Sequence, residues 1–279
     1  YPLFNFLIFN DIQLLDFGKL PTSLLGVSGN RNVLGFDIVF KLIFVLYSFI
    51  NTKSIYKYFY LLLIFFTSSL LLLLSSRGAL IMFIFVCFLF LLHILKSKLF
   101  LNLFFLFPIL CSLASVRYLD SNRYNLVTKV SSIGLSDTST THRIFLYENT
   151  IDYIVKNPFI GCGIGNWKVE SLPYWKDRLS GYTIPYHAHN DFLELSAETG
   201  LLGGLSYLLV FIIIFCKYLL FYSRTFTLES LVVFSLCIVY FFDAFINFPL
   251  ERALSQVNFI VLLSLSLYIF KNSPHEKVN

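Results

Sequence analysis

The feature that most constrains this chain is a series of long apolar segments separated by short polar stretches and by one long loop. A helix needs about 20 apolar residues, and at least about 17, to cross the hydrocarbon core of a bilayer. Seven segments meet this requirement: residues 34–50, 58–74, 79–95, 99–115, 201–222, 228–247 and 253–270. The sequence therefore predicts an all-α fold, a polytopic transmembrane helical bundle.

The composition agrees with this prediction. Hydrophobic residues make up 57% of the chain and charged residues 13%, whereas about a quarter of the residues of a soluble domain are charged. The net charge of +5 does not indicate nucleic-acid binding, because the basic residues form short clusters between apolar segments. Such clusters encode membrane topology. We therefore expect a lipid bilayer as a partner and no nucleic acid.

Loop charge predicts the orientation of the bundle. Basic clusters follow the first, third, fifth and seventh predicted spans, namely Lys53 and Lys57, Lys96 and Lys98, Lys217 and Arg224, and Lys271 and Lys277. All four clusters fall on one side, which the positive-inside rule assigns to the cytoplasm. Residues 116–200 then form a large, partly helical loop on the opposite side, between the fourth and fifth spans.

Two helices are predicted within this loop. Residues 143–156 place apolar side chains on one face at helical spacing, namely Ile144, Tyr147, Ile151 and Ile154. Asn157-Pro158 is expected to end this helix. Residues 188–199 are predicted to form a second helix that leads into the fifth span.

The first candidate site residue is Arg77, in the turn between the second and third spans. A helix that begins there presents free N–H groups and a partial positive charge. With the guanidinium added, the turn is suited to bind a phosphate at the membrane surface. The alternative is an arginine that extends to the membrane interface for solvation alone.

The second candidate is Arg143, which the periodicity places in the first turn of the loop helix. A cation is disfavoured at that end of a helix. We therefore expect an anionic ligand or an acidic neighbour for Arg143, although a solvated surface arginine is the plainer alternative.

The third candidate is the segment from Asn157 to Trp167, with glycines at 161, 163 and 165. Gly161, Gly163 and Gly165 allow a tight turn and a close backbone approach, and such a turn can hold a phosphate. The segment lacks the preceding strand and the lysine of nucleotide-binding motifs. By itself it indicates a structural turn.

The fourth candidate begins at His187 and reads His-Ala-His-Asn-Asp-Phe-Leu-Glu. A histidine such as His189 can take a proton from a sugar hydroxyl near neutral pH. Asn190, Glu194 and Glu198 would share one stripe of the following helix. A zinc site at His187 and His189, with Asp191 nearby, is an alternative, but a clear third and a clear fourth ligand are lacking.

In this order, the four pieces resemble the O-antigen ligase and polymerase family over roughly residues 28–215. The similarity consists of Ser-Arg-Gly at the start of a span and a long loop containing Arg143. The glycine turn follows, and then His189-Asn190, nine residues and Gly200. The chain departs from the family in having His142, where a glycine is common.

The resemblance implies a donor glycan on undecaprenyl pyrophosphate and transfer to an acceptor hydroxyl with inversion, without nucleotide sugar, metal or other cofactor. Arg77 and Arg143 would bind the pyrophosphate. His189 would be the general base, and Asn190 would orient the base or the sugar. Supporting roles would fall to Gly161, Gly163, Gly165, Glu194 and Gly200. The protein would lie in the bacterial inner membrane with its active site facing the periplasm.

Several alternatives remain open from the sequence. A ligase would use lipid A core or a protein as acceptor, and a polymerase would extend a growing glycan. A transporter of lipid-linked sugars would also need basic residues, but we would expect those to line its spans. The chain begins at Tyr1 and has fewer N-terminal spans than a complete family member, so we expect residues 1–279 to be a truncated membrane domain that contains residues 116–200 as its catalytic loop.

Overall fold

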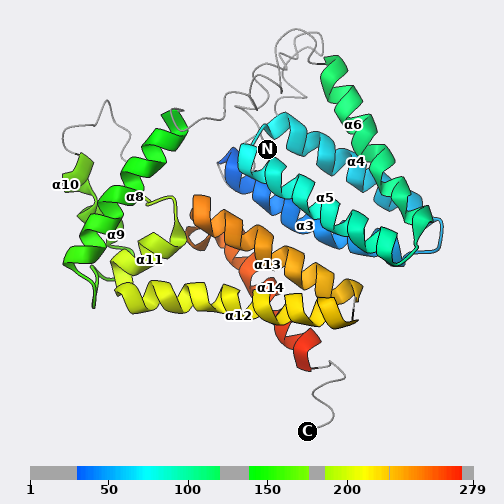
Figure 1. Cartoon of the computed structure of the whole chain (residues 1–279). Helices are drawn as coiled ribbons and strands as arrows, with labels where there is room; N and C mark the ends of the chain where they lie inside the picture. Colours follow the sequence, from blue (N-terminus) through cyan, green and yellow to red (C-terminus); the bar gives the residue numbers. More distant parts are fainter. Residues whose placement is uncertain (1–29, 120–137, 176–185, 226, 272–279) are drawn as a thin grey trace.

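A computed structural model describes residues 30–119, 138–175, 186–225 and 227–271, and every regular element within these ranges is a helix. Six helices are long and apolar enough to span a membrane (Figure 1). They are α3 (Arg31–Asn51), α4 (Tyr56–Leu74), α5 (Arg77–Lys96), α12 (Leu201–Thr225), α13 (Leu228–Ile246) and α14 (Ala253–Lys271). The predicted all-α polytopic membrane fold is therefore confirmed.

The fourth predicted span differs from the prediction. The chain first forms a 3-10 helix, η2 (Phe100–Phe105), and then α6 (Leu106–Leu119), and the apolar stretch is shorter than the six spans. Pro108 lies in the first turn of α6 and has no N–H to offer the carbonyl of Phe104. This proline explains why an α-helix begins at Leu106 instead of running through from residue 99.

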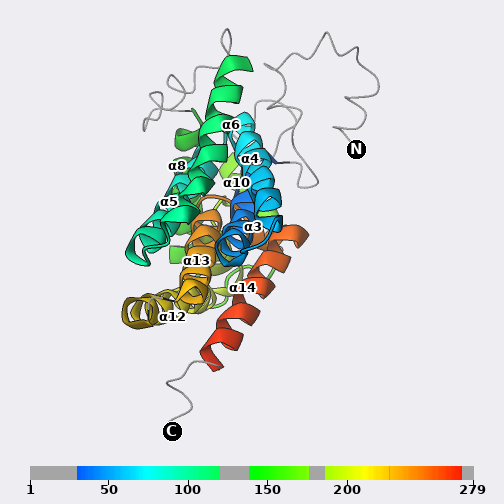
Figure 2. The same ribbon diagram turned by 90° about the vertical axis from the view of Figure 1, so that its right-hand side faces the viewer.

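Helices α3, α5 and α13 form the centre of the bundle (Figures 1 and 2). They approach closely at one end because of two glycines. A Cβ atom on Gly35 would lie 2.7 Å from that of Ala79, and one on Gly78 would lie 2.6 Å from the side chain of Ile246. We call this end, where α3, α5 and α12 begin, the loop end.

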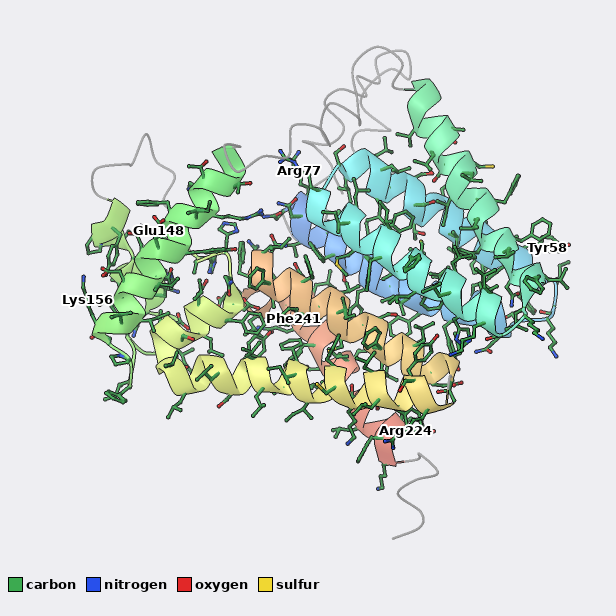
Figure 3. The ribbon with its side chains drawn as sticks, in the orientation of Figure 1. Tyr58, Arg77, Glu148, Lys156, Arg224 and Phe241 are labelled. Carbon is green, nitrogen blue, oxygen red and sulfur yellow. The ribbon has the colours of Figure 1, made fainter. Side chains whose placement is uncertain are left out.

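The basic clusters lie at the opposite end of the bundle. In Figure 3, Arg224 and Tyr58 lie there, whereas Arg77, Glu148 and Lys156 lie at the loop end. Lys277 is outside the described residues. The helices thus alternate in direction as the charge pattern requires.

Four helices form an outer layer on the loop end: α8 (Thr138–Lys156), α9 (Trp167–Glu170), α10 (Leu172–Trp175) and α11 (Asp191–Thr199). Helix α11 packs against α8, α12 and α13. Helix α8 ends before Asn157, as predicted, but it begins at Thr138. Arg143 therefore lies in the second turn of α8, and the expectation that it occupies the first turn was wrong.

The buried face of α8 also differs from the prediction. Ile144 and Ile151 are 40% and 47% exposed, whereas Leu146, Thr150 and Ile154 are buried. The hydroxyl of Thr150 donates to the carbonyl of Leu146 at 2.7 Å. Because this polar group is satisfied within the helix, it can be buried in place of an isoleucine.

The second loop helix is shorter than predicted. It begins at Asp191, because His189 has a φ of +55° and Asn190 is extended. Gly200, with a φ of +82°, separates it from α12. The predicted helix over residues 188–199 is therefore confirmed from Asp191 to Thr199, and it leads into α12 through Gly200.

Candidate functional site

His189 occupies a strained position just before α11. Its φ of +55° lies in the left-handed region, which residues other than glycine seldom adopt. Residues with such backbone strain cluster at functional sites. The ring of His189 meets the edge of Phe248, with centroids 4.8 Å apart at 82°. Its buried Nδ1 atom has no hydrogen-bond partner among the described residues. Phe248 thus packs against the imidazole, while one of its two ring nitrogens makes no hydrogen bond to the described residues.

Two neighbours fix the backbone of His189. The side-chain oxygen of Asn190 accepts from the N–H of Leu193 at 3.1 Å and so caps the start of α11. The hydroxyl of Tyr147 lies 3.0 Å from the carbonyl oxygen of His189 and 3.1 Å from that of Phe245. Tyr147 therefore ties the histidine both to α8 and to the end of α13.

The surroundings of His189 keep its imidazole neutral. Burial lowers its pKa to about 4, and the positive charge of Arg143 acts in the same direction. Lesser contributions come from His142, His187 and Arg252. At neutral pH the ring is therefore unprotonated, which is the form required of a proton acceptor.

Arg143 faces the same region from α8, one helical turn before Tyr147. Burial raises the pKa of Tyr147, and the positive charge of Arg143 opposes that rise. The same charge adds to the burial that lowers the pKa of His189, so the guanidinium lies near both side chains. Among the described residues no carboxylate lies within ion-pair distance of Arg143, since the ion pairs there join other residues. The acidic neighbour considered from the sequence is therefore absent from the described part of the chain.

Arg77 lies at the same end of the bundle. It is the first residue of α5, and the adjacent Gly78 packs against Ile246 at the end of α13. The neighbouring residues of that end, Phe245 and Phe248, contact Tyr147 and His189. Figure 3 shows Arg77 at the loop end, on the side facing α8. The structure thus gathers both predicted arginines and the predicted histidine at one end of the bundle.

Two of the three residues considered for zinc, His187 and Asp191, have separate partners. Nδ1 of His187 lies 2.8 Å from a carboxylate oxygen of Glu194, whose other oxygen accepts from the N–H of Ala188. The carboxylate of Asp191 accepts from the N–H of Leu250 at 3.1 Å. Within the described ranges, no three His, Cys, Asp or Glu side chains are arranged to hold a metal. Glu194 instead orients His187.

The glycine turn binds the end of α11. The N–H groups of Cys162 and Gly163 donate to the carbonyls of Ala197 and Glu198, at 2.9 and 2.8 Å. Gly161 has a φ of +69°, and a Cβ there would lie 2.6 Å from the backbone of Glu198. These N–H groups are already used, so the turn fixes the layer that carries His189.

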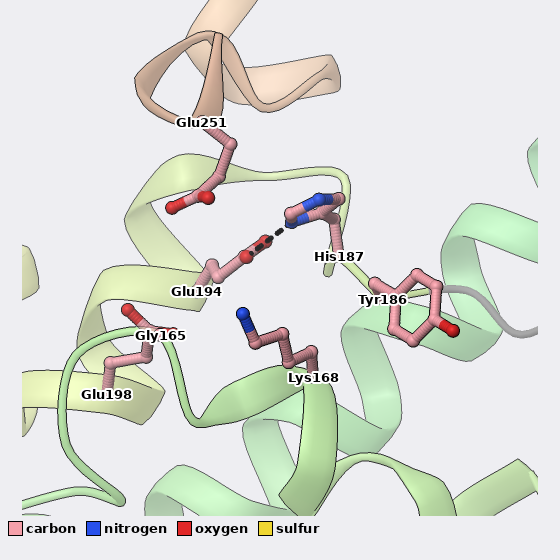
Figure 4. Close-up of a pocket in the computed structure, with 7 residues that line it drawn as sticks. All are labelled: Gly165, Lys168, Tyr186, His187, Glu194, Glu198 and Glu251. Carbon is pink, nitrogen blue, oxygen red and sulfur yellow. Dashed lines mark hydrogen bonds and ion pairs between the residues drawn. The ribbon is translucent and has the colours of Figure 1, made fainter.

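A polar cavity of about 350 Å³ lies beside this site (Figure 4). Its lining residues are Gly165, Lys168, Tyr186, His187, Glu194, Glu198 and Glu251. Glu198 accepts from the N–H groups of Gly165 and Trp167, and burial raises its pKa. Sequence reasoning placed Glu194 and Glu198 on one stripe but did not find Lys168, Glu251 or Phe248. No local sequence pattern marks Lys168 and Glu251 as part of the cavity, or Phe248 as a neighbour of His189.

The family assignment follows from sequence comparison. A family model described as O-antigen ligase matches residues 60–208, more than half of the chain, and this range includes Arg77, Arg143 and His189. The chain belongs to the O-antigen ligase family. The glycine turn and the histidine segment that were singled out from the sequence both lie within the residues that the family model matches.

Several curated proteins are similar over shorter ranges. A Rickettsia typhi protein named as a polysaccharide ligase is 30% identical over 87 residues, which cover 29% of this chain and 20% of the relative. The exopolysaccharide production protein ExoQ of Rhizobium meliloti is 29% identical over 118 residues, which cover 40% of this chain and 27% of ExoQ. The matched part of the chain thus spans less than a third of the length of either relative.

Proposed function

We propose that the protein is an inverting glycosyltransferase of the bacterial inner membrane, which moves a glycan from undecaprenyl pyrophosphate to an acceptor hydroxyl. The observation that carries this proposal is the unprotonated His189 imidazole, with its unsatisfied nitrogen, beside the guanidinium of Arg143. A base next to a cation suits a reaction in which a hydroxyl loses a proton while a phosphate gains charge.

In the proposed reaction, the acceptor oxygen forms a bond to the anomeric carbon on the face opposite the pyrophosphate. The bond from that carbon to the pyrophosphate oxygen breaks, and its electron pair leaves with undecaprenyl pyrophosphate. His189 takes the proton of the acceptor hydroxyl. Arg143 and Arg77 offset the charge that grows on the leaving group. With two guanidinium groups in this role, the proposal requires no metal ion.

Donor binding would also strengthen the base. The free protein holds the pKa of His189 at about 4, which makes it a weak proton acceptor. A bound pyrophosphate would place negative charge beside the ring and raise that pKa, because an opposite charge favours the protonated form. The histidine would thus become an effective base when the donor is in place.

The remaining predicted residues would act by positioning these groups. Asn190 caps α11 directly after His189, and its role would be to orient the base. Glu194 would orient His187, and Gly161, Gly163, Gly165 and Gly200 would hold the outer layer in place. We place this layer, residues 116–200, in the periplasm, because the basic clusters at the opposite end favour the cytoplasm.

The test is reconstitution of the full-length protein in liposomes with an undecaprenyl-pyrophosphate-linked oligosaccharide and lipid A core. Ligase activity would yield the glycan on lipid A core. Similarity to ExoQ, an exopolysaccharide production protein, favours a polymerase as the second candidate, which would yield longer chains on the lipid carrier. Movement of the lipid-linked sugar across the bilayer without a new glycosidic bond would contradict both and support a transporter.

A further inference from the structure

The cavity of Figure 4 is lined by two charged side chains, Lys168 and Glu251, that do not pair with each other. Lys168 on α9 and Glu251 in η3 (Pro249–Glu251) both line it, and both are exposed. Of the ion pairs among described residues, only His187 with Glu194 includes a lining residue. Lys168 and Glu251 therefore both face the cavity, and no ion pair between them blocks it.

The charge of the cavity is predominantly negative. Three carboxylates line it, and a single lysine opposes them. Glu194 and Glu198 are only 6% and 5% exposed, and each already accepts hydrogen bonds from the protein. Lys168 and Glu251 are thus the charged groups left to meet a ligand. A volume of about 350 Å³ is at the lower end of the range for ligand sites, which begins near about 300 Å³.

The cavity is connected to the proposed base through one aromatic ring. His187 lines the cavity and stacks on Phe248, with centroids 4.4 Å apart at 14°. His189 meets the edge of the same ring at 4.8 Å. A ligand in the cavity would therefore lie one aromatic ring away from the proposed base.

We propose that this cavity binds a sugar unit of the acceptor glycan, and that it selects for units without an anionic substituent. This inference rests on the proposed glycosyltransferase function. Sugar hydroxyls would donate to Glu251 and accept from Lys168, and an amino group would gain from the excess of carboxylates. A uronic acid or a phosphorylated sugar would be repelled by those carboxylates, with only Lys168 to offset them.

The test measures sugar binding to the full-length protein in nanodiscs, by saturation-transfer NMR and without donor. The probes are glucosamine, galactosamine, glucose, galactose, glucuronate and galacturonate, which present two ring configurations in three charge states. We expect both hexuronates to bind at least about tenfold more weakly than the hexosamines. Glu251→Gln should weaken hexosamine binding roughly threefold to tenfold, and Glu148→Gln, at an exposed position of α8, should leave it unchanged.

The proposal is overturned if none of the six sugars binds, if hexuronates bind as well as hexosamines, or if Glu251→Gln has no effect. The His189→Ala protein separates this inference from the proposed function, because sugar binding should persist there while transfer is lost. Intact, charge-selective binding in a wild-type protein that shows no transfer would count against the glycosyltransferase proposal alone.

A different observation concerns the outer side of the glycine turn. Its apolar side chains Phe159, Ile160 and Ile164 are 83%, 82% and 80% exposed. The turn is joined to the start of α12, since the N–H of Leu201 donates to the carbonyl of Pro158 at 2.8 Å. The adjoining Leu202 is 73% exposed on a membrane-spanning helix. The apolar turn thus continues the lipid-facing surface of α12.

We infer that Phe159, Ile160 and Ile164 insert into the bilayer at its interface and so set the depth of the outer layer. Apolar side chains beside a span are stabilised by such insertion. The test is a Phe159→Trp variant of the full-length protein in liposomes containing brominated lipid. The added tryptophan should be quenched by bromine, whereas the added tryptophan of Glu148→Trp, on the exposed face of α8, should not. Unquenched emission from position 159 would overturn the inference.

Discussion

The bundle and the outer layer of this protein are held together in different ways. The bundle has an extensive core of apolar side chains from all six spans, including Phe36, Val39 and Leu236. In the described part of the outer layer the buried apolar cluster is much smaller and consists of Ile154, Trp167, Ala188 and Ala197. Backbone hydrogen bonds from the glycine turn and single polar contacts complete that layer.

This difference shows where the structure is sensitive to single residues. In the bundle, many similar contacts share the stabilisation, so the apolar pattern decides the fold. In the outer layer, one glycine, one tyrosine hydroxyl or one carboxylate determines the position of a helix. The candidate chemistry lies in this second region. Substitutions there should therefore affect activity more than comparable substitutions in the bundle.

The largest effect is expected from the two histidines on Phe248. His189→Ala should reduce the rate of transfer by about 10²- to 10⁴-fold, because it removes the proposed general base. His187→Ala, on the face of the ring whose edge meets His189, should retain most of the catalytic rate and mainly weaken acceptor binding. The measurement is the maximal rate of transfer at saturating donor and saturating acceptor, with the acceptor concentration varied. Equal losses in the two variants would contradict the separate roles of the histidines.

The next effect tests the glycines of the outer layer. A Cβ on Gly200 would lie 2.6 Å from the carbonyl carbon of Phe159, whereas one on Gly165 meets nothing within 4 Å. Both residues have a positive φ. Gly165→Ala should therefore destabilise by about 1–2 kcal/mol through backbone strain alone.

Gly200→Ala adds a steric clash to that strain and should destabilise the outer layer by about 3 kcal/mol or more. Limited proteolysis of the protein in nanodiscs should detect this as faster cleavage in the loop, with the bundle intact. Similar cleavage rates for the two alanine variants would show that the close contact at Gly200 is not required.

A smaller effect is expected for donor binding. Arg143→Ala should raise the KM for the lipid-linked donor roughly tenfold to a hundredfold, the equivalent of losing one charged hydrogen bond. Arg143→Lys should lie between this variant and the wild type, because a lysine keeps the charge but not the planar fork. Lys156→Ala, at the far end of α8, is the matched control. An unchanged KM in Arg143→Ala would remove Arg143 from the donor site.

The smallest effect on activity is expected in the bundle. Asp37 is buried, and it accepts from the side chains of Asn258 at 2.9 Å and Lys41 at 2.6 Å. Asp37→Ala leaves the buried Asn258 amide without a partner, which should destabilise the bundle by about 1–3 kcal/mol. Thermal unfolding in detergent should show this loss, with the transfer rate per folded molecule little changed. A large loss of transfer at full stability would place Asp37 in the chemistry.

The sequence was sufficient for most of the bundle and for the end of α8. Six spans follow from apolar length, and the ion pair of Asp37 and Lys41 joins residues whose spacing of four places them on one face of a helix. The fourth predicted segment differs in form, because it is a shorter apolar stretch made of a 3-10 helix and α6. Apolar length alone does not indicate that Pro108 interrupts the α-helix. The buried face of α8 was predicted correctly for Ile154 but not for Ile144 and Ile151. The polar Thr150 is buried instead, because its hydroxyl is satisfied within the helix.

The candidate site was only partly predictable. Arg77, Arg143 and His189 stand in recognisable local motifs, so the sequence could identify them. The positive φ of His189, and its contact with Phe248, depend on the end of α13, which lies almost sixty residues further along the chain. The position of Glu251 in the cavity likewise depends on a contact between segments far apart in the sequence. Contacts between elements so far apart leave no periodic signal in a single sequence.

The most direct test of the account is the pKa of His189 with and without undecaprenyl pyrophosphate. It can be followed by NMR of histidine-labelled full-length protein in nanodiscs, with the signal assigned by its loss in a His189→Gln variant. The account predicts a pKa of about 4 in the free protein and a shift toward neutrality when the lipid pyrophosphate binds. A pKa that does not change on saturation with this lipid would show that no pyrophosphate lies beside the imidazole, and would contradict the proposed site.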